Sequence, residues 1–134
     1  MATMIAHITV KPDKEAEWEA ICRTLHAATH AEEPGVVRYE YWRGSEPRSY
    51  YAILSFVDHR AFIVHQASDH HEDASPQIRD CLETFRLEFV DPVGGASEFP
   101  PTEHQSAPDG ANDLTRKYTD RFAAQVADWW RDLR

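Results

Sequence analysis

The segment from Glu33 to Asp73 constrains the fold most, because two strands, a turn and a helix follow one another within it. A Pro-Gly turn leads into an aromatic strand over residues 36–42, and a polar turn returns the chain into a second strand over residues 50–56. Asp58 has the residue type and the position of a helix cap. The segment therefore predicts an antiparallel hairpin followed directly by a helix that carries His65.

The flanking residues supply the other elements of one small sheet. Residues 4–10 alternate with the period of a strand, and residues 13–30 place apolar side chains at helical spacing, with Asp13 expected to cap that helix. Residues 68–81 predict a second helix after the one that carries His65, and residues 82–90 alternate again. The order β-α-β-β-α-β predicts an α+β, ferredoxin-like fold with an antiparallel sheet. Both faces of that sheet are apolar enough to need cover.

The composition changes after Asp91. Residues 92–111 are rich in Pro, Gly and Ser and predict a surface linker. Residues 112–134 carry an apolar stripe that is typical of one amphipathic helix, capped by Asn112. The stripe has to dock, either over the pocket of its own chain or against a partner subunit, and the sequence leaves both open. We expect a domain over 1–91, a linker over 92–111 and a C-terminal helix over 112–134.

The charge balance disfavours several classes of partner. The chain has 14 Lys and Arg against 23 Asp and Glu, a formal net charge of -9, and no basic run, so neither nucleic acid nor an anionic membrane is expected as a partner. No apolar run of membrane-spanning length and no signal-like N-terminus is present, which predicts a soluble, cytoplasmic protein. Because 134 residues form only one modest core, a useful pocket favours a homodimer.

Two motifs resemble a known family. Glu33-Pro34-Gly35 before an aromatic strand, and Ala-Phe-x-x-His-x-x-Ser over residues 61–68, resemble the antibiotic biosynthesis monooxygenase family. The resemblance covers about residues 4–90 and implies a homodimer whose two sheets form a shared α+β barrel, with a pocket in each subunit between sheet and helices. Several members oxygenate quinol-like or anthrone-like aromatics with O2 and neither metal nor flavin. Others degrade haem, and related barrels cyclise polyketides.

His65 is the candidate base that this resemblance implies. A deprotonated phenol or anthrone is itself the electron donor to O2, so the protein has to supply a base, a group that stabilises the oxyanion and a dry aromatic pocket. Imidazole titrates near neutral pH, which suits that role, and the alternative is a histidine that packs the helix on the sheet. The expected substrate pocket comprises Tyr39, Tyr50, Ala52, Leu54, Phe56, Phe62 and Arg79.

No cofactor and no metal are expected. Residues 69–73, Asp-His-His-Glu-Asp, contain metal-ligand types but no HExxH motif, and acidic residues are favoured at a helix start in any case. Glycine-rich nucleotide-binding loops are absent from the sequence. Cys22 and Cys81 lack the local context of a nucleophile and are expected as free buried thiols.

Several positions depart from the oxygenases of the family. Those proteins typically end the third strand with Glu-Arg-Trp, whereas this chain has Leu54, Ser55 and Phe56, and their strand asparagine falls at Ala52. A haem-ligating histidine would fall near Ser75, so the haem branch is not expected. Three possibilities stay open. The first is a cofactor-independent monooxygenase acting on a small aromatic, quinol or polyketide-like substrate. The second is a non-oxidative cyclase, isomerase or small-molecule-binding protein, and the third is a structural or interaction dimer.

Overall fold

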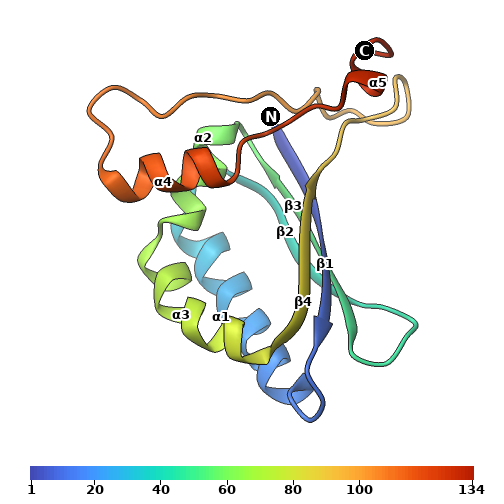
Figure 1. Cartoon of the computed structure of the whole chain (residues 1–134), viewed down its shortest axis with the longest axis vertical. Helices are drawn as coiled ribbons and strands as arrows, with labels where there is room; N and C mark the ends of the chain where they lie inside the picture. Colours follow the sequence, from blue (N-terminus) through green and yellow to red (C-terminus); the bar gives the residue numbers. More distant parts are fainter.

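One antiparallel sheet with helices against a single face makes up the fold (Figure 1). The computed structural model describes all 134 residues. The elements in chain order are β1 (Ala2–Val10), α1 (Glu15–Glu32), β2 (Val36–Arg43), β3 (Ser49–Phe56), α2 (His59–Gln66), α3 (Asp69–Cys81), β4 (Leu82–Phe89), α4 (Asp113–Arg121) and α5 (Asp128–Arg131).

The strand order confirms the ferredoxin-like topology. The order across the sheet is β2-β3-β1-β4, so β1 lies between β3 and β4 and pairs antiparallel with both. Ala6 shows the register, since it lies opposite Ala52 on one side and Leu87 on the other. Side chains in register point to the same face, so these three residues face the helices together.

The two faces of the sheet differ in cover. Alternate residues of β1, from Ala2 to Val10, are buried beneath the helices. The opposite face carries Ile5 opposite Ile53, and Trp42 opposite Tyr51. Trp42 is 52% exposed and Tyr51 is 38% exposed, and no helix of the chain covers this face (Figure 1). Only one of the two apolar faces expected to need cover is therefore covered within the chain.

A β-bulge at the start of β2 changes which side chains face inward. Val36 lies opposite Phe56 while Arg38 lies opposite Ser55, so Val37 is an extra residue in this strand. Strict alternation along residues 36–42 predicts that Val37 shares a face with Tyr39. This prediction is wrong, because Val37 is 41% exposed whereas Tyr39 is buried. Val36 packs against the core instead, because the bulge shifts the alternation by one residue.

The predicted caps of the later helices are confirmed. Asp58 accepts a hydrogen bond from the Ala61 amide at 2.7 Å, and Ser68 caps α3 by accepting one from the His71 amide. Asn112 caps α4 in the same way. These caps separate α2 from α3 by a sharp turn, so that the end of one helix and the start of the next lie close together.

Asp13 does not cap α1. The helix begins at Glu15 with Lys14 at the N-cap position, and Asp13 has a φ of 63°. The left-handed conformation of Asp13 belongs to a tight turn in which the Lys14 amide donates to the Lys11 carbonyl at 3.2 Å. Asp residues tolerate this conformation better than most, so the same residue that favours a cap also favours this turn.

The tail is not the single helix predicted over residues 112–134. Helix α4 ends at Arg121, and a short α5 follows after an irregular stretch. The Phe122 carbonyl lies 2.8 Å from Nε2 of the buried His59, and the Ala124 amide donates to His104 at 3.3 Å. These backbone groups bond to histidine side chains and not to a continuing helix, which helical periodicity alone does not reveal.

Helix α4 docks on its own chain. Phe122 packs edge-on against Phe62 of α2, with ring centroids 5.6 Å apart. Residues 92–111 run across one end of the sheet and bring the chain to α4 (Figure 1). Thr102 fixes this segment through its hydroxyl. The hydroxyl donates to the Val90 carbonyl at 2.8 Å and accepts a hydrogen bond from the Thr3 amide at 3.1 Å.

None of the helices is both long and apolar enough to cross a membrane. The division into three regions stays a prediction.

Candidate functional site

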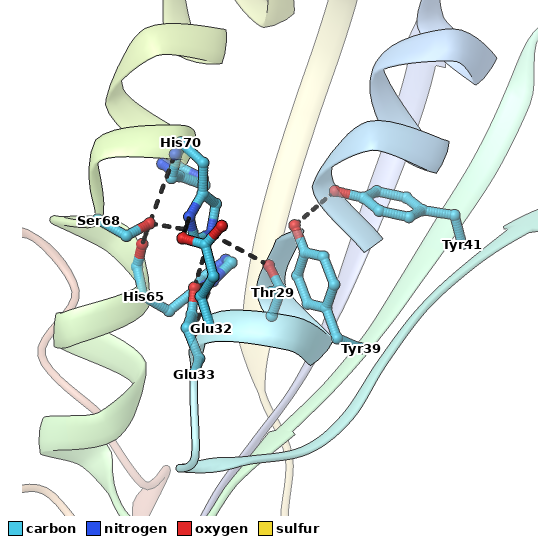
Figure 2. A network of polar contacts seen from close by, with 9 residues as sticks. Thr29, Glu32, Glu33, Tyr39, Tyr41, His65, Ser68 and His70 are labelled. Atoms are coloured by element: carbon cyan, nitrogen blue, oxygen red, sulfur yellow. Dashed lines mark hydrogen bonds and ion pairs between the residues drawn. The ribbon is translucent and has the colours of Figure 1, made fainter. Parts of the chain in front are cut away.

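His65 and Glu33 form a buried pair where the two sequence motifs meet (Figure 2). His65 lies on the inner side of α2 and is 1% exposed, and Glu33 follows the last residue of α1. Nδ1 of His65 lies 2.9 and 3.1 Å from the two carboxylate oxygens of Glu33. The Pro-Gly turn and the cap of α2 therefore place side chains 32 residues apart in direct contact.

His70 completes the arrangement from the first turn of α3. Its Nε2 lies 2.8 Å from Oε1 of Glu33 and 3.1 Å from the hydroxyl of Ser68 (Figure 2). Because the acceptor is a buried carboxylate, the network assigns the ring N–H to Nδ1 of His65 and to Nε2 of His70. This assignment leaves the lone pair of His65 on Nε2, which has no hydrogen-bond partner within the protein.

A cavity of about 730 Å³ lies next to His65, between the sheet and helices α3 and α4. Tyr39 and Tyr41 line it from β2, and their hydroxyls share a hydrogen bond of 2.6 Å. Burial raises the pKa of both tyrosines, so both are neutral hydroxyls at neutral pH. Ala52 and Leu54 of β3 line it with apolar groups. The cavity has the size and the mixed lining of a small-molecule site.

His71 is a site residue that the sequence did not reveal. It lines the cavity, and its ring lies edge-on to His65 with centroids 5.0 Å apart. Burial lowers the pKa of His71 to about 3, with smaller contributions from His65 and His70 in the same direction. Nδ1 of His71 is buried without a hydrogen-bond partner. The sequence of residues 69–73 indicates a solvated helix start. The tight turn at Ser68 instead directs His70 toward Glu33 and His71 toward the cavity.

The predicted pocket residues divide into two groups. His65, Tyr39, Ala52, Leu54 and Arg79 line the cavity, whereas Tyr50, Phe56 and Phe62 do not. Tyr50 lies further along the sheet, where its hydroxyl donates to Glu19 at 3.1 Å. The Phe56 and Phe62 rings pack against each other behind His65 in the core. Tyr50, Ala52, Leu54 and Phe56 of β3 all face the helices. Strand alternation predicts this shared face, but it does not distinguish the residues that line the cavity from those that pack beneath a helix.

Helix α4 contributes a wall of the cavity that was not predicted. Lys117, Tyr118, Arg121 and Phe122 line it, and the Tyr118 hydroxyl donates to the Glu72 carboxylate of α3. Of the two dockings that the sequence left open for the tail, the structure shows α4 over the cavity of its own chain. The apolar stripe in the sequence indicates that this helix docks. The sequence does not indicate that its charged residues line the cavity.

Glu33, His65 and His70 are also the group most suited to a metal ion. Their ligand atoms all lie within 4.8 Å of one another, and two histidines with one carboxylate suit Zn²⁺ or Fe²⁺. His65 is hydrogen-bonded to Glu33 at 2.9 Å, and Nε2 of His70 lies within ion-pair distance of the same carboxylate at 2.8 Å, so all three groups have polar partners without an ion. The expectation of no metal and no cofactor stays a prediction.

The fold and the site define a ferredoxin-like α+β protein with a buried histidine–carboxylate pair beside a cavity of about 730 Å³. The family model described as antibiotic biosynthesis monooxygenase matches residues 1–77, more than half of the chain, and the chain belongs to this family. This confirms the resemblance of the two motifs. No match was found among curated proteins.

Solved structures agree with this fold. SO0527 of Shewanella oneidensis is 28% identical, with a TM-score of 0.61 over 66% of this chain and 87% of that one. A protein of Caulobacter crescentus, provisionally described as an antibiotic biosynthesis monooxygenase, is 26% identical, with a TM-score of 0.65 over 69% and 89%. PA3566 of Pseudomonas aeruginosa, 24% identical, has a TM-score of 0.62 over 66% and 90%, and shows the fold alone.

The low pKa of His71 predicts a loss of stability in acid. The unfolded chain takes up a proton on this residue near pH 6.5, whereas the folded protein resists until about pH 3, so the free energy of unfolding falls as the pH falls through this interval. We expect His71→Gln to flatten the acid side of the profile. Urea unfolding between pH 4.5 and 8 measures it, with the exposed His26→Gln as control. An acid loss that is the same in wild type and His71→Gln would contradict the prediction.

Proposed function

We propose that this protein is a monooxygenase that oxidises a small aromatic, quinol or polyketide-like substrate with O2, without metal or flavin. The observation that carries the proposal is the buried Glu33–His65 pair beside a cavity with aromatic walls. Family membership supports oxygenase chemistry in general.

Proton removal is the first step. Glu33 accepts the Nδ1–H of His65, so Nε2 carries the lone pair that takes a proton from a phenol or from an activated methylene of the substrate. The imidazolium that forms is stabilised by the same carboxylate, as in other histidine–carboxylate pairs. The Tyr39 and Tyr41 hydroxyls and the neutral His71 are the polar groups beside the cavity that suit the resulting oxyanion.

Oxygen then reacts with the anion. The substrate anion transfers one electron to O2, and the radical and superoxide combine, forming a C–O bond and a peroxide that takes the proton back from His65. Loss of water breaks the O–O bond and leaves a carbonyl where a methylene stood. The four electrons come from the substrate, so no external reductant is needed, and the apolar side chains that line the cavity limit the contact of the intermediates with water.

The open face of the sheet supports a homodimer as part of this proposal. Ile5, Ile53, Trp42 and Tyr51 form an apolar group there, and members of the family are typically dimers. Two such faces packed together form the shared α+β barrel that the family resemblance implies. A small-molecule aromatic ligand in each subunit, no nucleic-acid or membrane partner, and a cytoplasmic location stay predictions.

A non-oxidative reaction is the second candidate, and Ala52 and Leu54 favour it. Both line the cavity at strand positions where oxygenases of the family carry polar side chains, and neither offers a hydrogen bond. The Glu33–His65 pair also suits acid–base chemistry such as cyclisation or isomerisation, or simple ligand binding.

The monooxygenase proposal predicts O2 uptake that depends on His65. With an anthrone or a quinol as substrate, we expect His65→Gln to lower the rate about 100-fold or more, because the general base is lost. An oxygen electrode measures the rate, and circular dichroism checks that the variant folds. His26→Gln serves as control. No uptake above the uncatalysed rate, or equal uptake by His65→Gln, would contradict the proposal.

The two candidate reactions differ in their need for oxygen. The monooxygenase forms no product when the same substrates are incubated under strict anaerobiosis, because O2 is the second substrate. Chromatography of the anaerobic mixture is the measurement. Product that forms without O2, and that disappears in His65→Gln, would refute the oxygenase and establish the acid–base enzyme. Binding of the substrate without product in air or under anaerobiosis would identify a binding protein.

The dimer proposal predicts a particle of twice the chain mass of 15.4 kDa. We expect Trp42→Asp, which places a charge on the open face of the sheet, to shift the equilibrium toward monomer by about tenfold or more. Sedimentation equilibrium measures the mass, and Val93→Asp, on an exposed residue outside the sheet, is the control. A wild-type monomer at micromolar concentration would contradict the prediction.

A further inference from the structure

Three cationic side chains lie at the mouth of the cavity. Arg79 of α3 and Lys117 and Arg121 of α4 line the cavity and are exposed at the same time. All three lie outside residues 1–77, the part of the chain that the family model matches. Two of the three, Lys117 and Arg121, come from α4 of the tail, and Arg79 comes from the last turns of α3.

The protein does not neutralise these cations. Arg79 donates to the Ser75 hydroxyl at 2.5 Å, and the Arg121 guanidinium lies 5.3 Å from the centre of the Phe122 ring. No carboxylate lies within ion-pair distance of Arg79, Lys117 or Arg121. On a chain with a formal net charge of -9, three cations around one opening without a carboxylate partner indicate a negatively charged ligand.

The two carboxylates in the lining are already engaged. Glu72 accepts a hydrogen bond from Tyr118, and Glu83 pairs with Arg48. Burial and Glu72 raise the pKa of Tyr118, and Arg121 and Arg79 oppose this increase, as expected if both guanidinium groups lie near the hydroxyl. The cations of two helices thus converge on one region of the opening.

The cavity has two chemically different ends. Hydrogen-bonding groups, with His65 and Tyr39 among them, lie against the sheet and α2, whereas the cations belong to α3 and α4. We propose that the substrate is an aromatic carboxylate, whose ring lies beside His65 and whose carboxylate lies at the mouth between Arg79, Lys117 and Arg121. The planar guanidinium fork matches a carboxylate, and a charge left at the mouth is not fully desolvated.

The aromatic ring of the inferred substrate rests on the proposed function. Its negative charge rests only on the three cations at the mouth. The inference also assigns a role to the tail: α4 adds a wall to the cavity and selects the substrate by its charge. Neutral aromatics lack a partner for the cations and bind more weakly. A large polyanion does not fit a cavity of about 730 Å³ on an acidic chain.

Binding of a matched pair of probes tests the proposal. At neutral pH, 6-hydroxy-2-naphthoate carries a carboxylate and 2-naphthol carries none, while the ring and the hydroxyl are shared. We expect the naphthoate to bind the wild-type protein about tenfold more tightly, as one or two charge-assisted hydrogen bonds provide, and the difference to shrink at high salt. Titration calorimetry under anaerobic conditions gives both affinities without turnover. Equal affinities, or no binding of either probe at millimolar concentration, overturn the proposal.

Variants of the mouth locate the effect. We expect the double variant Arg79→Gln with Arg121→Gln to lose the preference for the naphthoate and to keep its affinity for 2-naphthol. Arg116→Gln is the matched control, because Arg116 is an exposed arginine of the same helix that does not line the cavity, and this variant keeps the preference. A preference that survives in the double variant overturns the proposal.

The outcomes separate this inference from the proposed function. Oxygen uptake with quinols or anthrones but no preference for the naphthoate refutes the anionic substrate and leaves the monooxygenase standing. A preference for the naphthoate that disappears in the double variant, without oxygen uptake from any substrate, refutes the monooxygenase and leaves the anion site standing.

Discussion

The buried carboxylate of Glu33 is the interaction on which the rest of the site depends. A carboxylate out of water costs several kcal/mol unless donors or cations surround it, and here His65 is hydrogen-bonded to Glu33 while Nε2 of His70 lies 2.8 Å from its Oε1. The three residues come from the end of α1, from α2 and from the first turn of α3. The same contact therefore holds three helices together on the sheet and fixes the ring orientation of the histidine that faces the cavity. Fold and chemistry share one polar network.

The tail adds a wall to the cavity beside this site. His59 is fully buried and holds the Phe122 carbonyl at the end of α4, and Phe122 packs on Phe62 of α2. This docking places Tyr118 over α3 and the cations of α4 at the opening. A family domain that ends with its fourth strand lacks this wall. The appended segment therefore bears on which molecules fit the cavity, while His65 beneath it lies in the part of the chain that the family model matches.

The departures from the family's oxygenases in β3 are matched by polar groups elsewhere. Ala52 and Leu54 offer no hydrogen bonds to the cavity, whereas Tyr39 and Tyr41 of β2 and His71 of α3 offer three neutral polar side chains. A shared fold does not fix activity, because a cavity can be equipped from any element that lines it. The polar side chains of this cavity come from β2 and α3, and not from β3, which carries them in the family's oxygenases.

The sequence by itself determined the elements, their order and the two family motifs, since alternation, helical spacing and capping residues are local properties. Only the tertiary structure decided that Glu33 contacts His65, that Val37 turns outward at a bulge, that Tyr50 is not part of the cavity lining, and that the tail breaks after α4. It also decided that His70 and His71 turn inward and that the cations of α4 meet Arg79 at one opening. These outcomes depend on hydrogen bonds and packing between residues distant in the chain, which no local pattern contains.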